Sequence, residues 1–256
     1  MSEHEASNKD VSCVICAHNE ASTIRKVVQT VSAVRELGQL IVVDDGSSDA
    51  TNAILKELER TTPLLTVVTH EKNKGKSAAL ASGLAVADRE YVLLLDADLI
   101  NLTTAHLESL LAPVLCGAVD VTISIRENSL AIYRLIGLDF VSGERAFPRT
   151  MIADNLEEVK KLPGYGFESF FNEILIARGM RLEAVRLPGV LNNRKYRKIG
   201  VVRGFFAEVG MIIDVLRVLT PWRAVRQVVQ LLRAKRQIVA APLSVFSRIR
   251  RLLSIP

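Results

Sequence analysis

A recurring pattern of short apolar runs is the feature that most constrains the fold of this chain. Four such runs, rich in β-branched residues, start 29, 24 and 27 residues apart: Val11–Cys16, Leu40–Val43, Leu64–Val68 and Tyr91–Leu95. Helical patterns separate them, at Ala21–Arg35, Ala50–Glu59 and Ser77–Ala87. Strands that are buried on both faces and joined by helices are typical of parallel sheets. The spacing therefore predicts an α/β fold with a mostly parallel central sheet flanked by helices.

The pattern is looser in the second half of the chain. It predicts strands over residues 118–125 and 182–187, and helices over 107–115, 130–141 and 168–178. From Val201 onward it predicts two or three amphipathic helices.

Polar, charged or glycine-rich residues follow each of the four apolar runs. These segments are Ala17-His18-Asn19-Glu20, Asp44-Asp45-Gly46, Asn73-Lys74-Gly75-Lys76 and Asp96-Ala97-Asp98. Open parallel sheets bind ligands beyond the carboxyl ends of their strands, and these ends meet at one edge. The sequence therefore predicts a ligand site at this edge.

Asp96 and Asp98 have the spacing of a cation site. Alternate residues of an extended segment point the same way, so both carboxylates can face one ion. Hard divalent ions such as Mg²⁺ and Mn²⁺ prefer oxygen ligands and commonly use one or two carboxylates with substrate phosphates. A helix cap or a solvated turn is the alternative. The position directly after a buried strand favours the metal site.

Asp44, Asp45 and Lys76 leave two interpretations open. The aspartates suit an Asp-Gly turn, or one of them accepts hydrogen bonds from a nucleoside. Lys76 is either a phosphate ligand or a solvated lysine at a helix start.

Taken together, the four polar segments resemble the pattern of glycosyltransferase family 2, including its Asp-x-Asp motif. The resemblance implies a GT-A fold, a nucleotide-diphospho-sugar donor and sugar transfer with inversion. It places Lys76 near the donor, and Asp96 and Asp98 at Mg²⁺ or Mn²⁺ and the diphosphate. The residues that it places around the nucleoside are Ala17, His18, Glu20 and Asp45. Cys16 and His18 depart from the proline and tyrosine that are usual at these positions.

Two later segments resemble the acceptor side of the same family. Ser142–Arg149 resembles its Gly-x-Arg segment, and the stretch ending in Glu168 resembles its Gly-x-Gly-x-Glu. We expect Arg145 and Arg149 to bind an acceptor phosphate; two ordinary surface arginines are the alternative.

Glu168 is the candidate general base, with Asp98 as the second catalytic carboxylate. A helix-start carboxylate is the alternative for Glu168, and a phosphate acceptor would need no strong base. Some family members place a histidine where this chain has Asn192 and Asn193.

The last quarter of the chain is strongly basic. Residues 193–256 contain fourteen Lys and Arg residues but two acidic ones, Glu208 and Asp214. Trp222–Ile238 and Leu243–Leu253 predict basic amphipathic helices, which suit an anionic membrane surface. In the first of these, the expected apolar face is Val225, Val228, Val229 and Leu232. Packing on the rest of the chain or on a second subunit is the alternative. Nucleic acid is disfavoured because the segment lacks interleaved aromatic residues.

We therefore expect a GT-A catalytic domain over residues 1–192, with a donor half at about 11–100 and an acceptor half at 101–192. Residues 193–256 form the basic helical appendage.

Three cysteines, a polar start and no window of about 20 apolar residues indicate a cytoplasmic protein, peripheral on the cytoplasmic face of the membrane. The expected acceptor is membrane-borne, such as a polyprenyl phosphate, and a homo-oligomer is possible. Two rivals stay open, a nucleotidyltransferase and a non-catalytic membrane adaptor.

Overall fold

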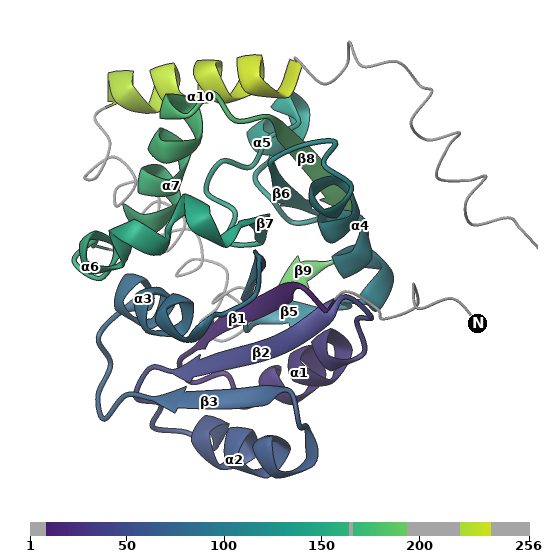
Figure 1. The fold of residues 1–256 in the computed structure, drawn as a ribbon, viewed down its shortest axis with the longest axis vertical. Coiled ribbons are helices and arrows are strands. Elements are labelled where there is room, and N and C mark those ends of the chain that lie inside the picture. The colour runs from purple at the N-terminus through teal and green to yellow at the C-terminus, as the bar shows by residue number, and fades with distance from the viewer. Residues whose placement is uncertain (1–8, 164–165, 194–220, 237–256) are drawn as a thin grey trace, which may run out of the picture.

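The protein is built around a seven-stranded sheet with strand order β3-β2-β1-β4-β7-β6-β8 (Figure 1). The computed structural model describes residues 9–163, 166–193 and 221–236. The strands of the sheet are β1 (Val11–Ala17), β2 (Leu37–Asp44), β3 (Leu65–Thr69), β4 (Tyr91–Asp96), β6 (Val121–Arg126), β7 (Arg145–Pro148) and β8 (Leu182–Leu187). β7 runs antiparallel to both of its neighbours, whereas the other pairings in this sheet are parallel. A second, two-stranded sheet joins β5 (Leu99–Ile100) to β9 (Leu191–Asn192).

Helices cover both faces of the central sheet. They are α1 (Ile24–Ser32), α2 (Thr51–Thr61), α3 (Lys76–Val86), α4 (Thr104–Leu115), α5 (Ala131–Ile136), α6 (Leu156–Val159), α7 (Gly166–Ala177) and α10 (Pro221–Arg236), with 3-10 turns η1 (Arg149–Met151) and η2 (Ala153–Asn155). One buried cluster joins α1, α2 and α4 to the sheet, and another joins α3, α6 and α7 to its opposite face. The predicted α/β fold is confirmed.

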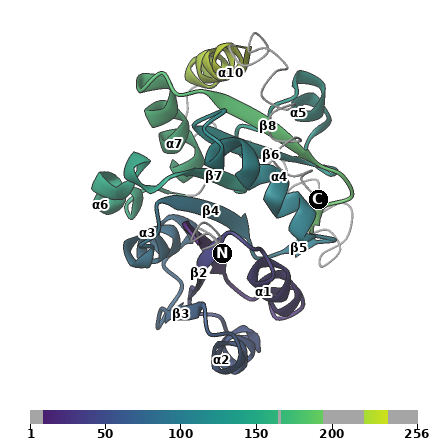
Figure 2. The same ribbon diagram turned by 45° about the vertical axis from the view of Figure 1, so that its right-hand side comes forward.

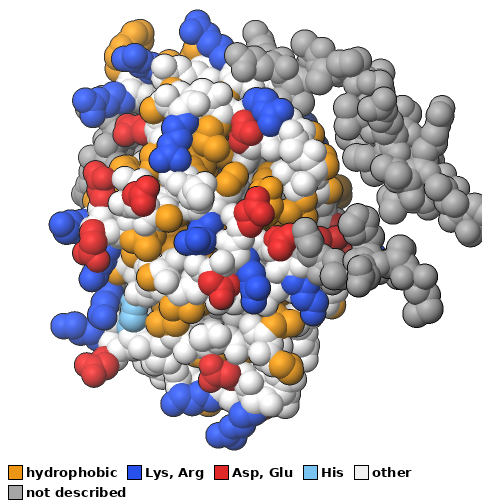
Figure 3. All heavy atoms as spheres, in the orientation of Figure 1, with side chains coloured by type: hydrophobic (Ala, Val, Ile, Leu, Met, Phe, Trp, Pro, Cys, Tyr) orange, Lys and Arg blue, Asp and Glu red, His pale blue; other side chains and the backbone are white. Residues whose placement is uncertain are grey.

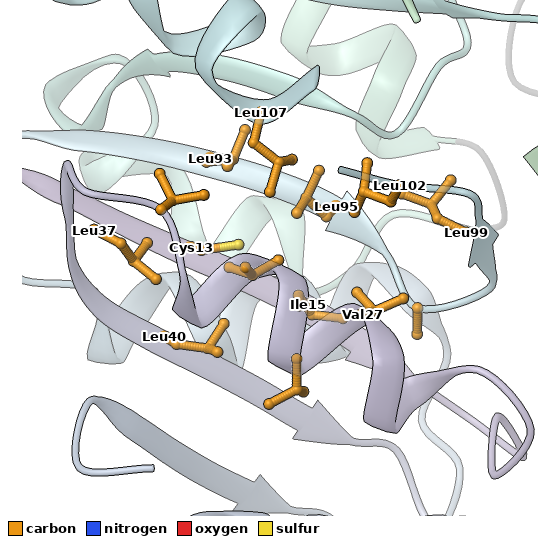
Figure 4. Close-up of a cluster of buried hydrophobic side chains, with 14 of the residues drawn as sticks. Cys13, Ile15, Val27, Leu37, Leu40, Leu93, Leu95, Leu99, Leu102 and Leu107 are labelled. Carbon is orange, nitrogen blue, oxygen red and sulfur yellow. The ribbon is translucent and has the colours of Figure 1, made fainter. Parts of the chain in front are cut away.

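Alternation along β1 explains why both faces are covered. Cys13 and Ile15 point to the side of α1, where Val27 packs against them, while Val14 belongs to the cluster on the opposite face (Figure 4). All of these side chains are at most 1% exposed. A strand buried on both faces must be apolar throughout, which is the pattern that the sequence carries.

The strand register gathers the predicted polar segments at one edge. Ala17 at the end of β1 pairs with Asp44 of β2, and Cys16 pairs with Asp96 of β4. Because β7 is antiparallel, it is its first residue, Arg145, that lies near this edge, opposite Leu94 of β4. The strand β7 was not predicted from the sequence, since it has four residues and begins and ends with Arg and Pro.

The second sheet brings a distant segment to the same edge. Leu99 of β5 pairs with Asn192 of β9, and the backbone N–H of Asn193 donates to the carbonyl of Asp98 at 2.9 Å. The segment around Asn192 therefore lies beside the Asp-x-Asp motif.

The helix α10 packs on α7 and β8, as both ribbon views show (Figures 1 and 2). Its buried residues are Gln227 and Leu231, whereas Val225 is 55% and Val229 is 42% exposed. The predicted apolar face is therefore divided, because Val228 and Leu232 pack against the buried cluster whereas Val225 and Val229 are exposed. Gln227 joins the packed side through polar contacts: its amide donates to the Ser169 carbonyl at 3.1 Å, and its oxygen accepts from Asn172 at 3.2 Å.

The rest of the basic appendage, including the helix predicted over 243–253, lies outside the described residues. The boundary at residue 192 stays a prediction. No helix in the described part of the chain is long and apolar enough to cross a bilayer.

Candidate active site

A lysine bridges two carboxylates at the carboxyl edge of the sheet. The Lys76 ammonium, in the first turn of α3, donates to Asp96 Oδ1 and to Glu168 Oε1, each at 3.0 Å. Asp96 ends β4 and Glu168 lies in the first turn of α7, so three elements meet at one cation. Burial acts to lower the pKa of Lys76, but the two carboxylates raise it well above its ordinary value. Lys76 is therefore held as a cation.

Arg126, the last residue of β6, contacts Asp96 from the other side. Its Nη1 is 3.4 Å from Asp96 Oδ2 and donates to Glu144 Oε1 at 2.6 Å. Burial acts to raise the pKa of Asp96, but Lys76 and Arg126 outweigh it and lower this pKa to about 2. Gly143 packs so closely that a Cβ there would lie 2.6 Å from Asp96 Oδ1. The Asp96 carboxylate is thus ionised and fixed in position.

Asp98 has the opposite electrostatic environment. Burial raises its pKa, and the neighbouring charges of Asp96, Glu20 and Glu144 raise it further, to about 7, although Arg126 acts against them. Its side chain accepts a hydrogen bond from Asn192 Nδ2 at 3.4 Å. Two carboxylates only two residues apart therefore differ in charge balance: Asp96 is paired with cations and Asp98 is surrounded by other carboxylates.

Asp45 shapes the loop that leads to Lys76. Its carboxylate accepts hydrogen bonds from the backbone N–H groups of Lys74 at 2.9 Å and Gly75 at 2.8 Å, and from His70 Nδ1 at 2.7 Å. It is 3% exposed. The contact of this carboxylate with a nucleoside stays a prediction, and its oxygens already accept these three hydrogen bonds from the protein. Asp45 fixes the loop before α3.

The other residues predicted around the nucleoside lie at the same edge. Ala17 is buried at the end of β1 and its carbonyl accepts the backbone N–H of Asp45 at 2.9 Å. His18 is exposed, and its Nδ1 donates to the carbonyl of Asp45 at 2.9 Å. Glu20 is half-buried and close enough to Asp98 to raise the pKa of that carboxyl. The imidazole of His18 is the most exposed side chain of this segment.

The two arginines predicted at an acceptor phosphate lie elsewhere. Arg145 is fully buried: its guanidinium donates to the Ser142 and Phe140 carbonyls and to the Asn172 side chain, and lies 5.0 Å from the Phe171 ring centroid. It has no surface for a ligand and instead ties β7 to α7.

Arg149 follows β7 at the opposite edge of the sheet. Its backbone N–H donates to the carbonyl of Glu90, which precedes β4, and its Nε donates to the carbonyl of Arg89. Because Asp96 ends the same strand, the length of β4 separates the two residues. The prediction that Arg149 contacts an acceptor at this site is therefore wrong for this structure.

Sequence reasoning missed Arg126, Glu144 and His70. Arg126 directly follows a predicted strand, so the rule applied to the first four strands would have found it. Glu144 stands beside Arg145 in a segment that was singled out for its arginines. No sequence signal marks His70, whose Nε2 accepts from Ser82 Oγ at 2.9 Å while its Nδ1 binds Asp45.

The chemistry of this edge fits a hard divalent cation. Asp98 is an oxygen donor among three other carboxylates, Glu20, Asp96 and Glu144. In residues 9–163, 166–193 and 221–236, no three His, Cys, Asp or Glu side chains are placed to hold a metal by themselves. A Mg²⁺ or Mn²⁺ ion here would therefore complete its shell with substrate phosphates and water, which is the usual mode for Mg²⁺.

Comparison with solved structures supports the fold. The crystal structure of glucosyl-3-phosphoglycerate synthase from Mycobacterium tuberculosis, in complex with Mn²⁺, UDP and glucosyl-3-phosphoglycerate, superposes with a TM-score of 0.61. The match covers 81% of this chain and 79% of that one, at 24% identity. The complex of the same enzyme with Mn²⁺, UDP-glucose and phosphoglyceric acid gives a TM-score of 0.59 at 25% identity, with the same two shares.

Curated relatives match a shorter region. The succinoglycan biosynthesis protein ExoU of Rhizobium meliloti (strain 1021) is 34% identical over 93 residues, which are 36% of this chain and 27% of the relative. Poly-beta-1,6-N-acetyl-D-glucosamine synthase of Staphylococcus aureus (strain COL) is 33% identical over 91 residues, 35% of this chain and 22% of the relative. The matched region thus spans about a quarter of the length of these relatives. The model of the glycosyl transferase family 2 matches residues 12–168, more than half of the chain. This protein therefore belongs to glycosyltransferase family 2.

Proposed function

We propose that this protein transfers a sugar, with inversion, from a nucleotide-diphospho-sugar to a membrane-borne acceptor such as a polyprenyl phosphate. The observation that carries the proposal is the cluster of Lys76, Asp96, Asp98, Glu168 and Arg126 at the carboxyl edge of the sheet. The cluster combines two cations that are held by ion pairs, Lys76 and Arg126, with the Asp98 carboxylate, whose charged neighbours are mostly other carboxylates. The glucosyl-3-phosphoglycerate synthase of this fold, crystallised with Mn²⁺ and UDP-glucose, supports the class of donor.

Donor binding is assigned to the loops that end β1 and β2 and precede α3. The exposed His18 ring is available to a nucleoside. The Lys76 side chain, which is 34% exposed, is assigned to the diphosphate. Asp45 positions Lys76 by fixing the backbone of Lys74 and Gly75. A cation at the departing diphosphate stabilises the charge that develops as the sugar leaves.

Asp98 is the proposed metal ligand, with Asp96 beside it. A bound Mg²⁺ or Mn²⁺ would neutralise diphosphate charge and so make the nucleotide a better leaving group. Asp96 positions Lys76 and Arg126, which it contacts directly. Asp98 rather than Asp96 is assigned to the metal because Asp96 already has two cationic partners.

Glu168 has a specific geometric role in this proposal. Its side chain has no exposed surface and one oxygen binds Lys76, so it positions the lysine. The other oxygen, Oε2, is buried without a hydrogen-bond partner among the described residues. With a phosphate acceptor no general base is required, because a phosphate oxygen is already ionised near neutral pH. A hydroxyl acceptor would instead need Glu168 as its base.

The basic helix α10 supports a membrane-borne acceptor and peripheral membrane association. Its described residues carry Arg and Lys but no acidic residue, which suits anionic lipid. A polyprenyl phosphate presents its phosphate at the level of the lipid headgroups, where a surface-bound enzyme reaches it.

The test measures which leaving group is released. The purified chain with Mn²⁺ is incubated with individual nucleotide sugars, with and without a short-chain polyprenyl phosphate. Release of nucleoside diphosphate together with a glycolipid product is the expected result. Asp98→Asn should lower the rate by at least about 100-fold. The matched control is Asp88→Asn, an exposed carboxylate next to Arg89 at the opposite edge of the sheet, which should leave the rate unchanged.

Three outcomes count against the proposal. Release of pyrophosphate from a nucleoside triphosphate and a sugar 1-phosphate, in a parallel reaction without nucleotide sugar, would identify a nucleotidyltransferase. No turnover of any nucleotide sugar, together with an unchanged melting temperature on adding them with Mn²⁺, would favour a non-catalytic role. Transfer to a water-soluble phosphorylated acceptor but never to polyprenyl phosphate would overturn the membrane-borne acceptor alone.

A further inference from the structure

We propose that α5 and the exposed face of α10 together form a single surface that inserts into the headgroup region of an anionic bilayer. The catalytic domain would then touch the membrane directly, through α5, rather than only through its basic appendage. The inference rests on the proposed function for its link to the acceptor, but its physical test does not require turnover.

Exposed large apolar side chains are concentrated on these two helices. Six such side chains occur among the described residues, and five of them lie on α5 or α10: Ile132 (53% exposed), Leu135 (82%), Trp222 (79%), Val225 (55%) and Val229 (42%). The sixth, Val86, is on α3. Isolated exposed apolar residues are ordinary, whereas a concentration of them marks an interaction surface.

The two helices belong to one end of the molecule. The Lys235 ammonium of α10 donates to the carbonyl of Gly137, the residue that caps α5. Tyr133 of α5 and Val228 of α10 pack against the same buried cluster. Both ribbon views place α5 and α10 together at the end of the molecule remote from α2 (Figures 1 and 2). The exposed side chains of α5 and α10 are therefore parts of one end of the protein.

Charge indicates the partner. Arg223, Arg226 and Arg233 are exposed on α10, and the helix carries no acidic residue. Figure 3 shows Lys and Arg side chains along the upper edge of the molecule, where α10 lies in Figure 1. A second copy of the chain would bring these arginines against one another, which disfavours self-association. An anionic bilayer matches both the apolar and the cationic side chains of this surface. The apolar side chains enter the acyl boundary, and the guanidinium groups bind lipid phosphates.

The surface is linked to the active site through a short segment. Arg126, which contacts Asp96, lies five residues before α5. Ser129 joins the two: its Oγ accepts from the Arg126 backbone N–H at 3.1 Å and donates to Asp139 at 2.7 Å. Lipid contact at α5 would thus hold the Arg126 side of the site close to the headgroups, where a lipid-borne phosphate lies.

The single tryptophan of the chain provides a direct measurement. The full chain is titrated with phosphatidylcholine vesicles that contain or lack about 30% anionic phosphatidylglycerol. Trp222 fluorescence is recorded during the titration. With the anionic vesicles we expect a blue shift, and quenching when the lipids carry bromine on their acyl chains. Pure phosphatidylcholine should bind at least about tenfold more weakly, because it offers no net charge to three arginines.

Variants test the contribution of α5. The double variant Ile132→Ser with Leu135→Ser should raise the anionic lipid concentration for half-maximal binding about 10- to 100-fold, since two apolar side chains no longer enter the bilayer. The matched control is Val86→Ser, the exposed apolar residue on α3, which should bind like the unchanged chain. Circular dichroism and the melting temperature are measured to check that the variants fold, which is expected because the substituted positions are exposed.

Several results would overturn the inference. The α5 double variant could bind anionic vesicles as tightly as the Val86→Ser control, or Trp222 could escape quenching by brominated lipid. A dimer in solution that the α5 variant converts to monomer, with no vesicle binding, would show that a second copy covers the surface. Release of nucleoside diphosphate in the presence of the short-chain polyprenyl phosphate is measured on the same samples. Lipid binding without this release would contradict the proposed function and leave this surface in place, and release without lipid binding would do the reverse.

Discussion

At the scale of single residues, charge compensation separates the two aspartates of the Asp-x-Asp motif. Asp96 is paired with Lys76 and Arg126, whereas Asp98 has carboxylate neighbours that raise its pKa to about 7. Both are aspartates at the end of one strand, so the sequence alone treats them as equivalent. The difference comes from α3 and β6, which approach Asp96 from elsewhere in the chain.

The raised pKa of Asp98 predicts a destabilising charge at alkaline pH. Between the ordinary pKa of an aspartate and about 7, the folded chain keeps a proton that the unfolded chain has lost, so stability falls as pH rises through this window. Asp98→Asn should therefore raise the melting temperature in metal-free buffer at pH 8 by about 2–4 °C, the effect of about 1 kcal/mol in a chain of this size. The gain should be smaller at pH 5. Thermal unfolding at the two pH values checks this, and an equal effect at both would contradict it.

The lysine between Asp96 and Glu168 predicts a coupled pair. Lys76→Met leaves the buried Glu168 carboxylate without its cation and should lower the free energy of unfolding by about 2 kcal/mol, less than for a fully buried pair because Lys76 is partly exposed. Adding Glu168→Gln should recover part of the loss, because a neutral amide tolerates burial better. Urea unfolding of the two single variants and the double variant measures the coupling. Strictly additive effects would show that the pair does not interact.

Residue types at strand ends could be predicted, but not their burial. The rule that polar residues follow buried strands correctly brought Lys76, Asp96, Asp98 and Glu20 to one edge. The prediction for Arg145, which came from the resemblance to the family's Gly-x-Arg segment, failed because the identity of a residue does not reveal which way a four-residue strand turns its side chain. The Arg145 side chain points into a polar pocket formed by Phe140, Ser142 and Asn172. The segment before β7 and α7 together form that pocket, so it exists only in the folded chain.

At the scale of elements, the loop before β7 supports the end of β4. Gly143 leaves no room for a side chain, since a Cβ would lie 2.6 Å from Asp96 Oδ1. Gly143→Ala should displace the Asp96 carboxylate from Lys76 and Arg126 and weaken binding of a nucleotide sugar with Mn²⁺ about tenfold or more. Isothermal titration measures the affinity.

The control for this variant separates site geometry from general strain. Gly117→Ala adds a Cβ in open space but at a φ of +69°, so it should cost about 1 kcal/mol of stability without changing ligand affinity. Equal affinity losses in the two variants would mean that Gly143 acts through stability alone.

Element prediction succeeded where periodicity was strong. The strand 182–187 was predicted with its observed bounds, and the helix predicted over 77–87 is displaced by one residue. β5, β7 and β9 were missed because two to four residues carry no measurable period. The packed face of α10 was predicted in part: Val228 and Leu232 lie on it. Gln227, whose amide is satisfied by α7, was missed because an apolar count ranks glutamine as solvent-facing.

At the scale of the whole molecule, α10 is part of the folded unit. Leu231 is fully buried against the cluster that also holds α7. Leu231→Ala should therefore lower the global free energy of unfolding by about 2–4 kcal/mol, measured by urea denaturation. Val229→Ala, one half-turn away and 42% exposed, should cost less than about 0.5 kcal/mol. If α10 were an independent appendage, neither variant would move the main unfolding transition.

The place of β7 in the sheet has a consequence for how the protein is made. Among the described strands, β3-β2-β1-β4 and β6-β8 are not paired with each other directly, because β7 lies between them, and β7 follows all but β8 of them in the chain. A ribosome therefore releases strands β1 to β4 before the strand that joins them to the other half of the sheet exists. Lys76 and Asp96 can meet early, but Arg126, Glu144 and Glu168 reach them only after β7 has docked and α7 has followed. The cluster on which the proposed function depends is thus completed late in synthesis.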